Sequence, residues 1–307
     1  MYVRRIPGGH WGMPPRRPIA ARATDNRLVS RTVFTRYVAL GDSITEGLCD
    51  AAPGRTGSWL GWADRLAGIL DVDARLSGGT VEFANLAVRG RRIGDVVDEQ
   101  IPEAVRLRPD LVSVLIGGND LMSPAADPDA LAAKLSDGVG WLRATGATVL
   151  LANLFDPQFA FFFKPFRGRA AVFSANIWSI ARDHRAQVLD IWGVREFQDP
   201  GMWAADRMHL SARGNRLLAS RVAQTLGVPS AESTATDGAG PFEPEPADVP
   251  FRTWLRVYAL PWAVRRVRRV SLGDGRGPKW PEPLPVGALL PRSPGFGSPP
   301  QALGGPH

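Results

Sequence analysis

Along residues 36–228, short apolar runs alternate with stretches in which apolar residues recur at helical spacing. This pattern predicts alternating strands and helices. Short apolar runs next to glycine or polar residues predict five strands, at 37–40, 81–86, 111–116, 147–152 and 187–191. Apolar residues at helical spacing fall between these runs and predict helices at 59–70, 93–105, 128–144 and 173–183. Ser211 is placed to cap a last helix, which we expect to end at Gly227.

This alternation indicates a parallel sheet covered by helices on both faces. Parallel strands need long crossover connections, and helices usually supply them. The sequence therefore predicts an α/β fold with about five strands in one sheet. Ligands of such sheets bind beyond the carboxyl ends of the strands, so residues directly after the strands are the candidates for chemistry.

The composition outside this region predicts a different organisation. Residues 1–34 are rich in Pro, Gly and Arg without periodicity, which favours a basic disordered extension before a globular domain at 35–228. The stretch 229–250 has the composition of a linker. Residues 251–270 interleave Arg with Trp, Leu and Val, which predicts a basic amphipathic helix with a kink at Pro261. The Pro- and Gly-rich residues 271–307 are expected to be disordered.

The net charge of +7 comes from the two arms of the chain. Residues 1–36 hold eight Arg and one acid, and residues 251–279 hold seven Arg, one Lys and one acid. Residues 37–250 hold 20 basic and 27 acidic side chains, so this acidic body gives no reason to expect nucleic-acid binding. The arms favour anionic surfaces such as membranes, and a bias of the whole sequence toward Arg, Ala and Gly is the alternative explanation.

Targeting and cysteine signals favour a cytoplasmic protein. The first ten residues include basic ones but no apolar core of a secretory signal follows them. No apolar run approaches the roughly 18 residues that span a bilayer. Cys49 is the single cysteine, so no intrachain disulfide is possible, and we expect it to be a small packed residue.

Three residues carry the pattern of a nucleophilic site. Ser43 follows the first predicted strand, and Asp206 and His209 precede the last predicted helix. A serine hydroxyl attacks carbonyl groups only when a base takes its proton and a third group orients that base. We therefore expect Ser43 to be the nucleophile, His209 the general base and later acid, and Asp206 its orienting partner. The alternative is that Ser43 caps a strand-to-helix turn.

Two further motifs turn this pattern into a family resemblance. Asn85-Leu-Ala-Val-Arg-Gly90 follows the second strand, and Gly117-Gly118-Asn119-Asp120 follows the third. In this order, with the Ser43 and Asp206–His209 motifs, residues 36–228 resemble the SGNH (GDSL) hydrolases. The resemblance implies a flavodoxin-like three-layer α/β/α sandwich. It also implies an oxyanion hole made by the backbone N–H groups of Ser43 and Gly90 and the side-chain amide of Asn119.

The resemblance implies no cofactor, and the sequence contains no metal-binding motif, paired cysteines or P-loop. The Gly-x-Ser-x-Gly elbow of the α/β-hydrolases is also absent, because Thr45 occupies its last position. Asp42 and Asp120 are expected to brace loops as hydrogen-bond acceptors. Gly90 as a turn glycine and Asn119 as a turn asparagine are the alternatives to the oxyanion roles.

The substrate is less well defined than the chemistry. The aromatic residues Phe161, Phe162 and Phe163 follow the fourth strand, and we hypothesise that they line or cover an acyl pocket; the alternative is that they pack on the core. The leading function is a serine esterase acting on a small-molecule, lipid or sugar ester, with lipase, thioesterase and carbohydrate deacetylase activities left open. The other class is a membrane-surface or partner-binding protein that acts through residues 251–270. A competing prediction is that this helix docks on the acidic body through Trp254 and Trp262. The oligomeric state is open.

Overall fold

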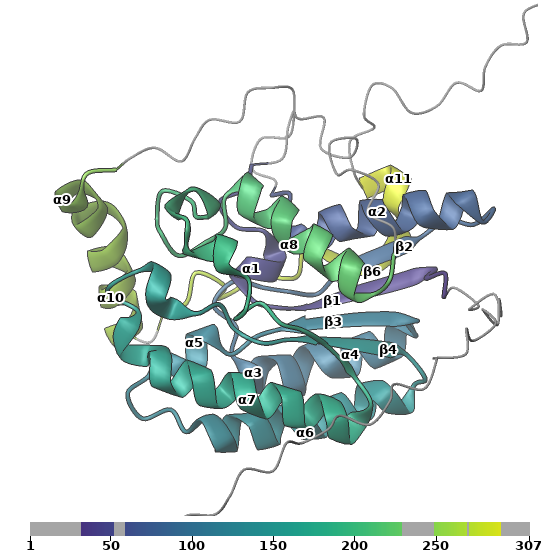
Figure 1. Ribbon diagram of the computed structural model, residues 1–307, viewed down its shortest axis with the longest axis horizontal. Helices are drawn as coiled ribbons and strands as arrows, with labels where there is room; N and C mark the ends of the chain where they lie inside the picture. The colour runs from purple at the N-terminus through teal and green to yellow at the C-terminus, as the bar shows by residue number, and fades with distance from the viewer. Residues whose placement is uncertain (1–31, 52–58, 229–248, 269, 290–307) are drawn as a thin grey trace, which may run out of the picture. The chain divides into compact units, whose positions relative to one another are not determined.

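The computed structural model describes residues 32–51, 59–228, 249–268 and 270–289 (Figure 1). All its helices and strands belong to the unit that begins at Val33. The predicted extension 1–34 and linker 229–250 fall almost wholly outside the described residues, as does the end of the tail, 290–307.

A six-stranded sheet in the order β5-β4-β3-β1-β2-β6 forms the middle layer. The five predicted strands are confirmed and pair in parallel. Their bounds are β1 Arg36–Gly41, β2 Glu82–Asn85, β3 Leu111–Leu115, β4 Thr148–Ala152 and β5 Gln187–Leu189. Residues of β1 and β3 are buried on both faces, which explains why these strands read as unbroken apolar runs.

Helices cover both faces of the sheet, so the predicted α/β fold is confirmed (Figure 1). One face packs against α2 Trp62–Leu76 and α8 Ala212–Thr225, which Ser211 caps by accepting from the Gly214 N–H at 3.2 Å. The other face packs against α6 Pro128–Ala144, α7 Arg167–His184 and the region 93–107. Between strands and helices lie short elements: α1 Ser43–Glu46, α5 Gly118–Leu121, and the 3-10 turns Pro157–Phe159, Lys164–Phe166, Arg195–Gln198 and Pro200–Met202.

Two predicted helices contain an internal proline, and both absorb it in the same way. The region 93–107 consists of α3 Ile93–Asp95, a π-turn Val96–Gln100 and α4 Ile101–Leu107, which contains Pro102. The C-terminal helix consists of α9 Phe251–Trp254, a π-turn Leu255–Ala259 and α10 Leu260–Val267, which contains Pro261. Proline lacks an N–H and clashes with the preceding turn, and a wider π-turn directly before it relieves both problems.

The sixth strand corrects the prediction of disorder for the C-terminal tail. Strand β6 Trp280–Pro285 pairs antiparallel with β2, and α11 Val286–Leu289 follows it. Its prolines occupy alternate positions, at 281, 283 and 285, while the Val286 N–H donates to the Val81 oxygen at 3.0 Å. The missing N–H groups therefore all lie on the side away from β2, which an edge strand tolerates. Disorder was wrongly predicted for 280–289 because the proline content was taken as evidence against a strand.

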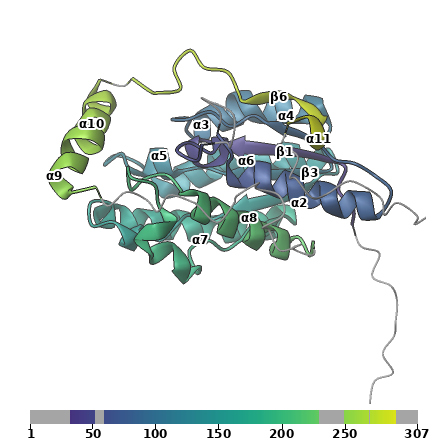
Figure 2. The same ribbon diagram turned by 90° about the horizontal axis from the view of Figure 1, so that it is seen from above.

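The helix from α9 to α10 lies at the same end of the sheet as α5, and an irregular segment connects it to β6 (Figure 2). None of the described helices is long and apolar enough to cross a lipid bilayer.

Candidate active site

The turn that carries Ser43 is held at the end of β1 by close packing and by Gln100. Gly41 has φ +151°, and a Cβ there would lie 2.4 Å from the Leu115 oxygen, so only glycine fits. The side chain of Gln100 accepts from the Gly41 N–H and donates to the Gly41 oxygen, both at 2.9 Å. Sequence reasoning missed Gln100, and a buried glutamine on a π-turn leaves no motif by which to find it.

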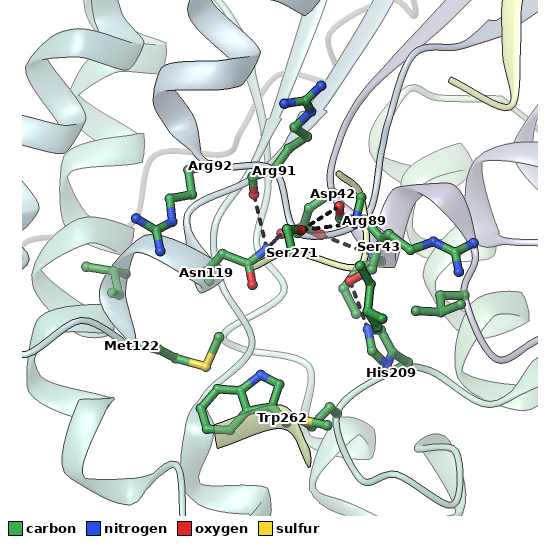
Figure 3. A pocket seen from close by; sticks show the side chains of 18 of the residues that line it. Asp42, Ser43, Arg89, Arg91, Arg92, Asn119, Met122, His209, Trp262 and Ser271 are labelled. Carbon is green, nitrogen blue, oxygen red and sulfur yellow. Dashed lines mark hydrogen bonds between the residues drawn. The ribbon is translucent and has the colours of Figure 1, made fainter. Parts of the chain in front are cut away.

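Ser43, His209 and Asp206 form one hydrogen-bonded chain, and Figure 3 shows its bond between Ser43 and His209. Ser43 Oγ lies 2.8 Å from His209 Nε2, and His209 Nδ1 lies 2.5 Å from Asp206 Oδ2. The other oxygen of Asp206 accepts from the backbone N–H groups of Met208 at 2.9 Å and His209 at 3.0 Å. The carboxylate is thereby fixed on two sides, and it fixes the imidazole ring with its second nitrogen toward the serine.

The Asp206 carboxylate and the His209 imidazole each shift the pKa of the other. Burial acts to lower the pKa of His209, but the adjacent Asp206 carboxylate outweighs burial and holds the pKa above its usual value. Burial acts to raise the pKa of Asp206, and the imidazole together with the backbone donors brings it below its usual range. The arrangement therefore stabilises a positive charge on the His209 imidazole.

The two other motifs reach the same place. Gly90, with φ +78°, and Asn119 line one cavity together with Ser43 and His209. The Asn119 amide nitrogen donates to Asp42 Oδ2 and to the Arg91 oxygen, both at 3.1 Å (Figure 3). A developing oxyanion would compete with these acceptors for the amide hydrogens.

Both predicted loop-bracing aspartates are hydrogen-bond acceptors. Asp42 accepts from the Ile44 N–H at 3.1 Å and so caps α1, and Asp120 accepts from the Ile93 N–H at 3.2 Å. Burial raises the pKa of each of these carboxyls to about 6. Because burial disfavours the charged form of both carboxyls, their ionisation in the folded protein lowers its stability.

The cavity has a volume of about 970 Å³, and its wall combines six Phe and Trp side chains with charged and small ones. Phe159 stacks on Trp203 with ring centroids 3.7 Å apart, and Phe163 packs against Phe159 at 5.9 Å. Of the three phenylalanines expected to line a pocket, Phe163 is among the lining residues and Phe161 and Phe162 are not. The remaining aromatic lining residues are Phe155, Phe166 and Trp262.

Phe161 and Phe162 contact the C-terminal helix instead. Their ring centroids lie 5.8 Å from Phe251 and 4.7 Å from Trp254, respectively. The prediction that they line the pocket is therefore corrected: the middle residues of this loop contact the C-terminal helix, whose docking on the globular domain was one of the two open predictions.

The C-terminal helix is docked on the loop that carries the acid and the base. Trp254 is 3% exposed, and its indole N–H donates to the Asp206 backbone oxygen at 2.8 Å. Arg207 lies over the Trp254 ring at 5.6 Å and donates to the Val249 oxygen at 2.9 Å. Trp262 lines the cavity, so both tryptophans of the predicted docking face contact the globular domain.

The turn after this helix closes a further side of the cavity, and sequence reasoning missed it. Ser271 lies directly against the second motif: a Cβ on Gly90 would be 1.9 Å from Ser271 Oγ. Gly273 approaches so closely that a Cβ there would be 2.0 Å from the Arg89 oxygen. Residues 270–274 and Arg265 all line the cavity. The glycine at 273 was the available signal, because it permits this close approach.

Cys49 also differs from its prediction, since it is exposed rather than packed. Its Sγ lies 3.4 Å from Asp206 Oδ2 and 3.9 Å from His209 Nδ1. Among the described residues these three side chains are the group with the donor atoms to hold a metal ion. The carboxylate and imidazole are already hydrogen-bonded to each other, so a metal would have to break that pair.

Comparisons with known proteins agree with this fold. The model of the GDSL-like Lipase/Acylhydrolase family matches residues 39–217. No curated protein matches the chain. Among solved structures, the acetylxylan esterase Axe2 from Geobacillus stearothermophilus is similar, with 22% identity, a TM-score of 0.53, and coverage of 64% of this chain and 95% of that one. An α/β hydrolase, LAE5, from the metagenome of Lake Arreo, Spain, has 22% identity and a TM-score of 0.54, and covers 63% of this chain and 95% of its own.

Proposed function

This chain belongs to the GDSL-like lipase/acylhydrolase family, and we propose that it hydrolyses a carboxylic ester through an acyl intermediate on Ser43. The observation that carries the proposal is the hydrogen-bonded chain from Ser43 through His209 to Asp206, with distances of 2.8 Å and 2.5 Å. A surface serine beside a histidine would not need the second, buried bond to a carboxylate.

The reaction follows from the positions of these atoms. His209 Nε2 takes the proton of Ser43 Oγ as that oxygen attacks the ester carbonyl, and Asp206 stabilises the resulting imidazolium. The imidazolium then gives its proton to the leaving alcohol. Water attacks the acyl-serine in the second half, with His209 again as the base, and releases the acid.

The negative oxygen of each tetrahedral intermediate needs donors, and the proposed ones are the N–H groups of Ser43 and Gly90 and the amide of Asn119. Losing one such donor usually lowers kcat by about 10²–10³-fold. Asn119→Ala is expected to fall in this range, with a much smaller effect on KM.

The cavity supports an ester with an apolar group larger than acetyl. An acetyl group would fill only a small part of a cavity of about 970 Å³, and the stacked Phe159 and Trp203 offer an apolar surface for a larger group. Burying one further methylene contributes about 0.8 kcal/mol, or roughly a fourfold gain in kcat/KM per carbon until the cavity is filled. The similar solved esterase is described as acting on acetylated xylan, and a sugar acetyl ester is the substrate class that the test below separates from ours.

Hydrolysis of p-nitrophenyl esters from acetyl to dodecanoyl tests both parts. Ser43→Ala is expected to abolish activity and labelling by a fluorophosphonate, whereas Ser123→Ala, which changes a serine lining the same cavity, retains both. Activity that persists in Ser43→Ala, or an intact chain inactive on every ester, contradicts the mechanism. A profile that falls steadily from acetyl upward contradicts the large-group substrate and favours a sugar deacetylase.

A further inference from the structure

The solvent side of the C-terminal helix carries a stripe of large apolar side chains. Val257, Leu260 and Val264 are 55%, 51% and 47% exposed. Their spacing of three and four residues places them on one face of the helix. Helices that pack on a domain by one face normally present polar residues on the other, so this stripe is unusual for a surface in contact with water alone.

Docking on the globular domain does not account for this stripe, because a different face does the docking. Trp254 is buried against the Asp206 loop and Trp262 lines the cavity. The same helix therefore has an inner face that packs on the domain and an outer face that remains exposed.

Further exposed apolar residues lie at both ends of the helix. Phe251 at its start is about half exposed and contacts the exposed Phe161, and Val270 and Leu272 after its end are also about half exposed. Val270 and Leu272 line the cavity as well, so exposed apolar side chains also border the cavity. Extended apolar surfaces of this kind mark sites of interaction.

The charge of the segment identifies the partner. Residues 251–273 contain six Arg and no acidic residue. Arg252, Arg256 and Arg268 are exposed beside the apolar stripe. Apolar side chains flanked by arginine match the boundary between the headgroups and acyl chains of an anionic bilayer. Two copies of this face would instead bring like charges together, which disfavours self-association through it.

We propose that the outer face of the helix 251–267, with Val270 and Leu272, docks on an anionic lipid surface and sets the active-site cavity beside it. The three stripe residues do not line the cavity, so substitutions there change the lipid-binding face without changing the cavity wall. The consequence of the proposed binding is that an apolar ester dissolved in a lipid layer is held next to the cavity.

Co-sedimentation of the full chain with vesicles tests the proposal. The chain is expected to bind phosphatidylcholine vesicles that contain phosphatidylglycerol, to release them at high salt, and to ignore pure phosphatidylcholine. The triple variant Val257→Asp, Leu260→Asp and Val264→Asp should lose binding. Leu76→Asp, which places one charge on the highly exposed end of α2, should retain it, as should Ser43→Ala.

A second variant covers the case in which three aspartates disturb the fold. Arg252→Gln with Arg256→Gln leaves the apolar packing intact and should weaken binding by roughly fivefold per arginine at low salt. The thermal transition of each variant, compared with the intact chain, shows that it is folded. The proposal is overturned if the intact chain does not bind at low salt, or if the folded triple and double variants bind the vesicles as well as the intact chain does. A dimer that the triple variant abolishes, without vesicle binding, would make a second copy the occupant and also overturn it.

Discussion

Trp254 supports the loop that carries Asp206 and His209 from outside the family-matched residues, and its replacement by Phe is predicted to slow catalysis. Phe keeps a ring for the contact with Phe162 but has no N–H for the Asp206 oxygen, 2.8 Å away. The backbone oxygen is then left in a buried place without this donor, which costs about 1–3 kcal/mol.

Part of this free energy lowers the stability of the whole fold, and part favours displacement of the loop that carries Asp206 and His209. A loss of about 2 kcal/mol in global stability lowers Tm by about 4–8 °C in a domain of this size. The loop can relieve the unpaired oxygen by moving toward water, which separates His209 from Ser43 in part of the population. If about 1.4 kcal/mol is lost in this way, kcat falls about tenfold. KM should change little, because Trp254 does not line the cavity.

The pH profile separates this role from plain loss of stability. The Asp206 carboxylate holds the pKa of His209 above its usual value. A displaced carboxylate raises that pKa less, so His209 loses its proton at lower pH. The acid limb of kcat/KM in Trp254→Phe should therefore move to lower pH.

The assay is hydrolysis of p-nitrophenyl butyrate between pH 5 and 10, with calorimetry of the same samples. Trp178→Phe is the matched control, since that tryptophan is half exposed on α7 and does not line the cavity. A lower Tm with unchanged kcat and an unchanged acid limb would refute the positioning role. If Trp254→Phe has the same Tm, kcat and acid limb as the intact chain, the hydrogen bond from Trp254 to Asp206 contributes to neither stability nor activity.

Three further predictions test other contacts of the site and of the C-terminal segment. Gly90→Ala should nearly abolish activity and destabilise the fold, because the added Cβ would lie 1.9 Å from Ser271 Oγ, and the further change Ser271→Gly should restore part of both. Additive effects in a double-mutant cycle would mean that the turn of Ser271 does not contact the loop of Gly90. Lys279→Met leaves the 1%-exposed Asp64 carboxylate without its ion pair and should cost about 3–5 kcal/mol in urea unfolding, and the added change Asp64→Asn should recover most of it. Burial raises the pKa of Asp42 to about 6, so the ionised carboxylate is disfavoured in the folded state. The free energy of unfolding of Asp42→Asn should therefore rise relative to that of the intact chain between pH 4 and pH 7, by up to about 3 kcal/mol. A difference in unfolding free energy that does not change with pH would contradict this.

The sequence was sufficient for the parallel sheet and for the residues at its carboxyl edge, for a physical reason. Buried parallel strands are apolar on both faces, so their runs are visible, and their ends mark where Ser43, Gly90 and Asn119 must gather. Docking of the C-terminal helix was one of the open predictions, but the turn at 270–274 and strand β6 were not predicted, because their contacts are tertiary. Ser271 meets residue 90 across a long stretch of chain, and β6 forms only because its prolines fall on the open side of an edge strand.

The C-terminal helix also resolves two predictions that had seemed to exclude each other. Docking on the domain and binding to a membrane each require an apolar face, and a helix with one such face can satisfy only one of them. This helix has Trp254 and Trp262 on the inner side and Val257, Leu260 and Val264 on the outer side. Docking on the domain and the proposed binding to a lipid surface therefore depend on different residues. The outer triple variant should lose vesicle binding with its acid limb unchanged, and Trp254→Phe should shift the limb and keep vesicle binding. If one substitution changed both readouts, the two faces would not act separately.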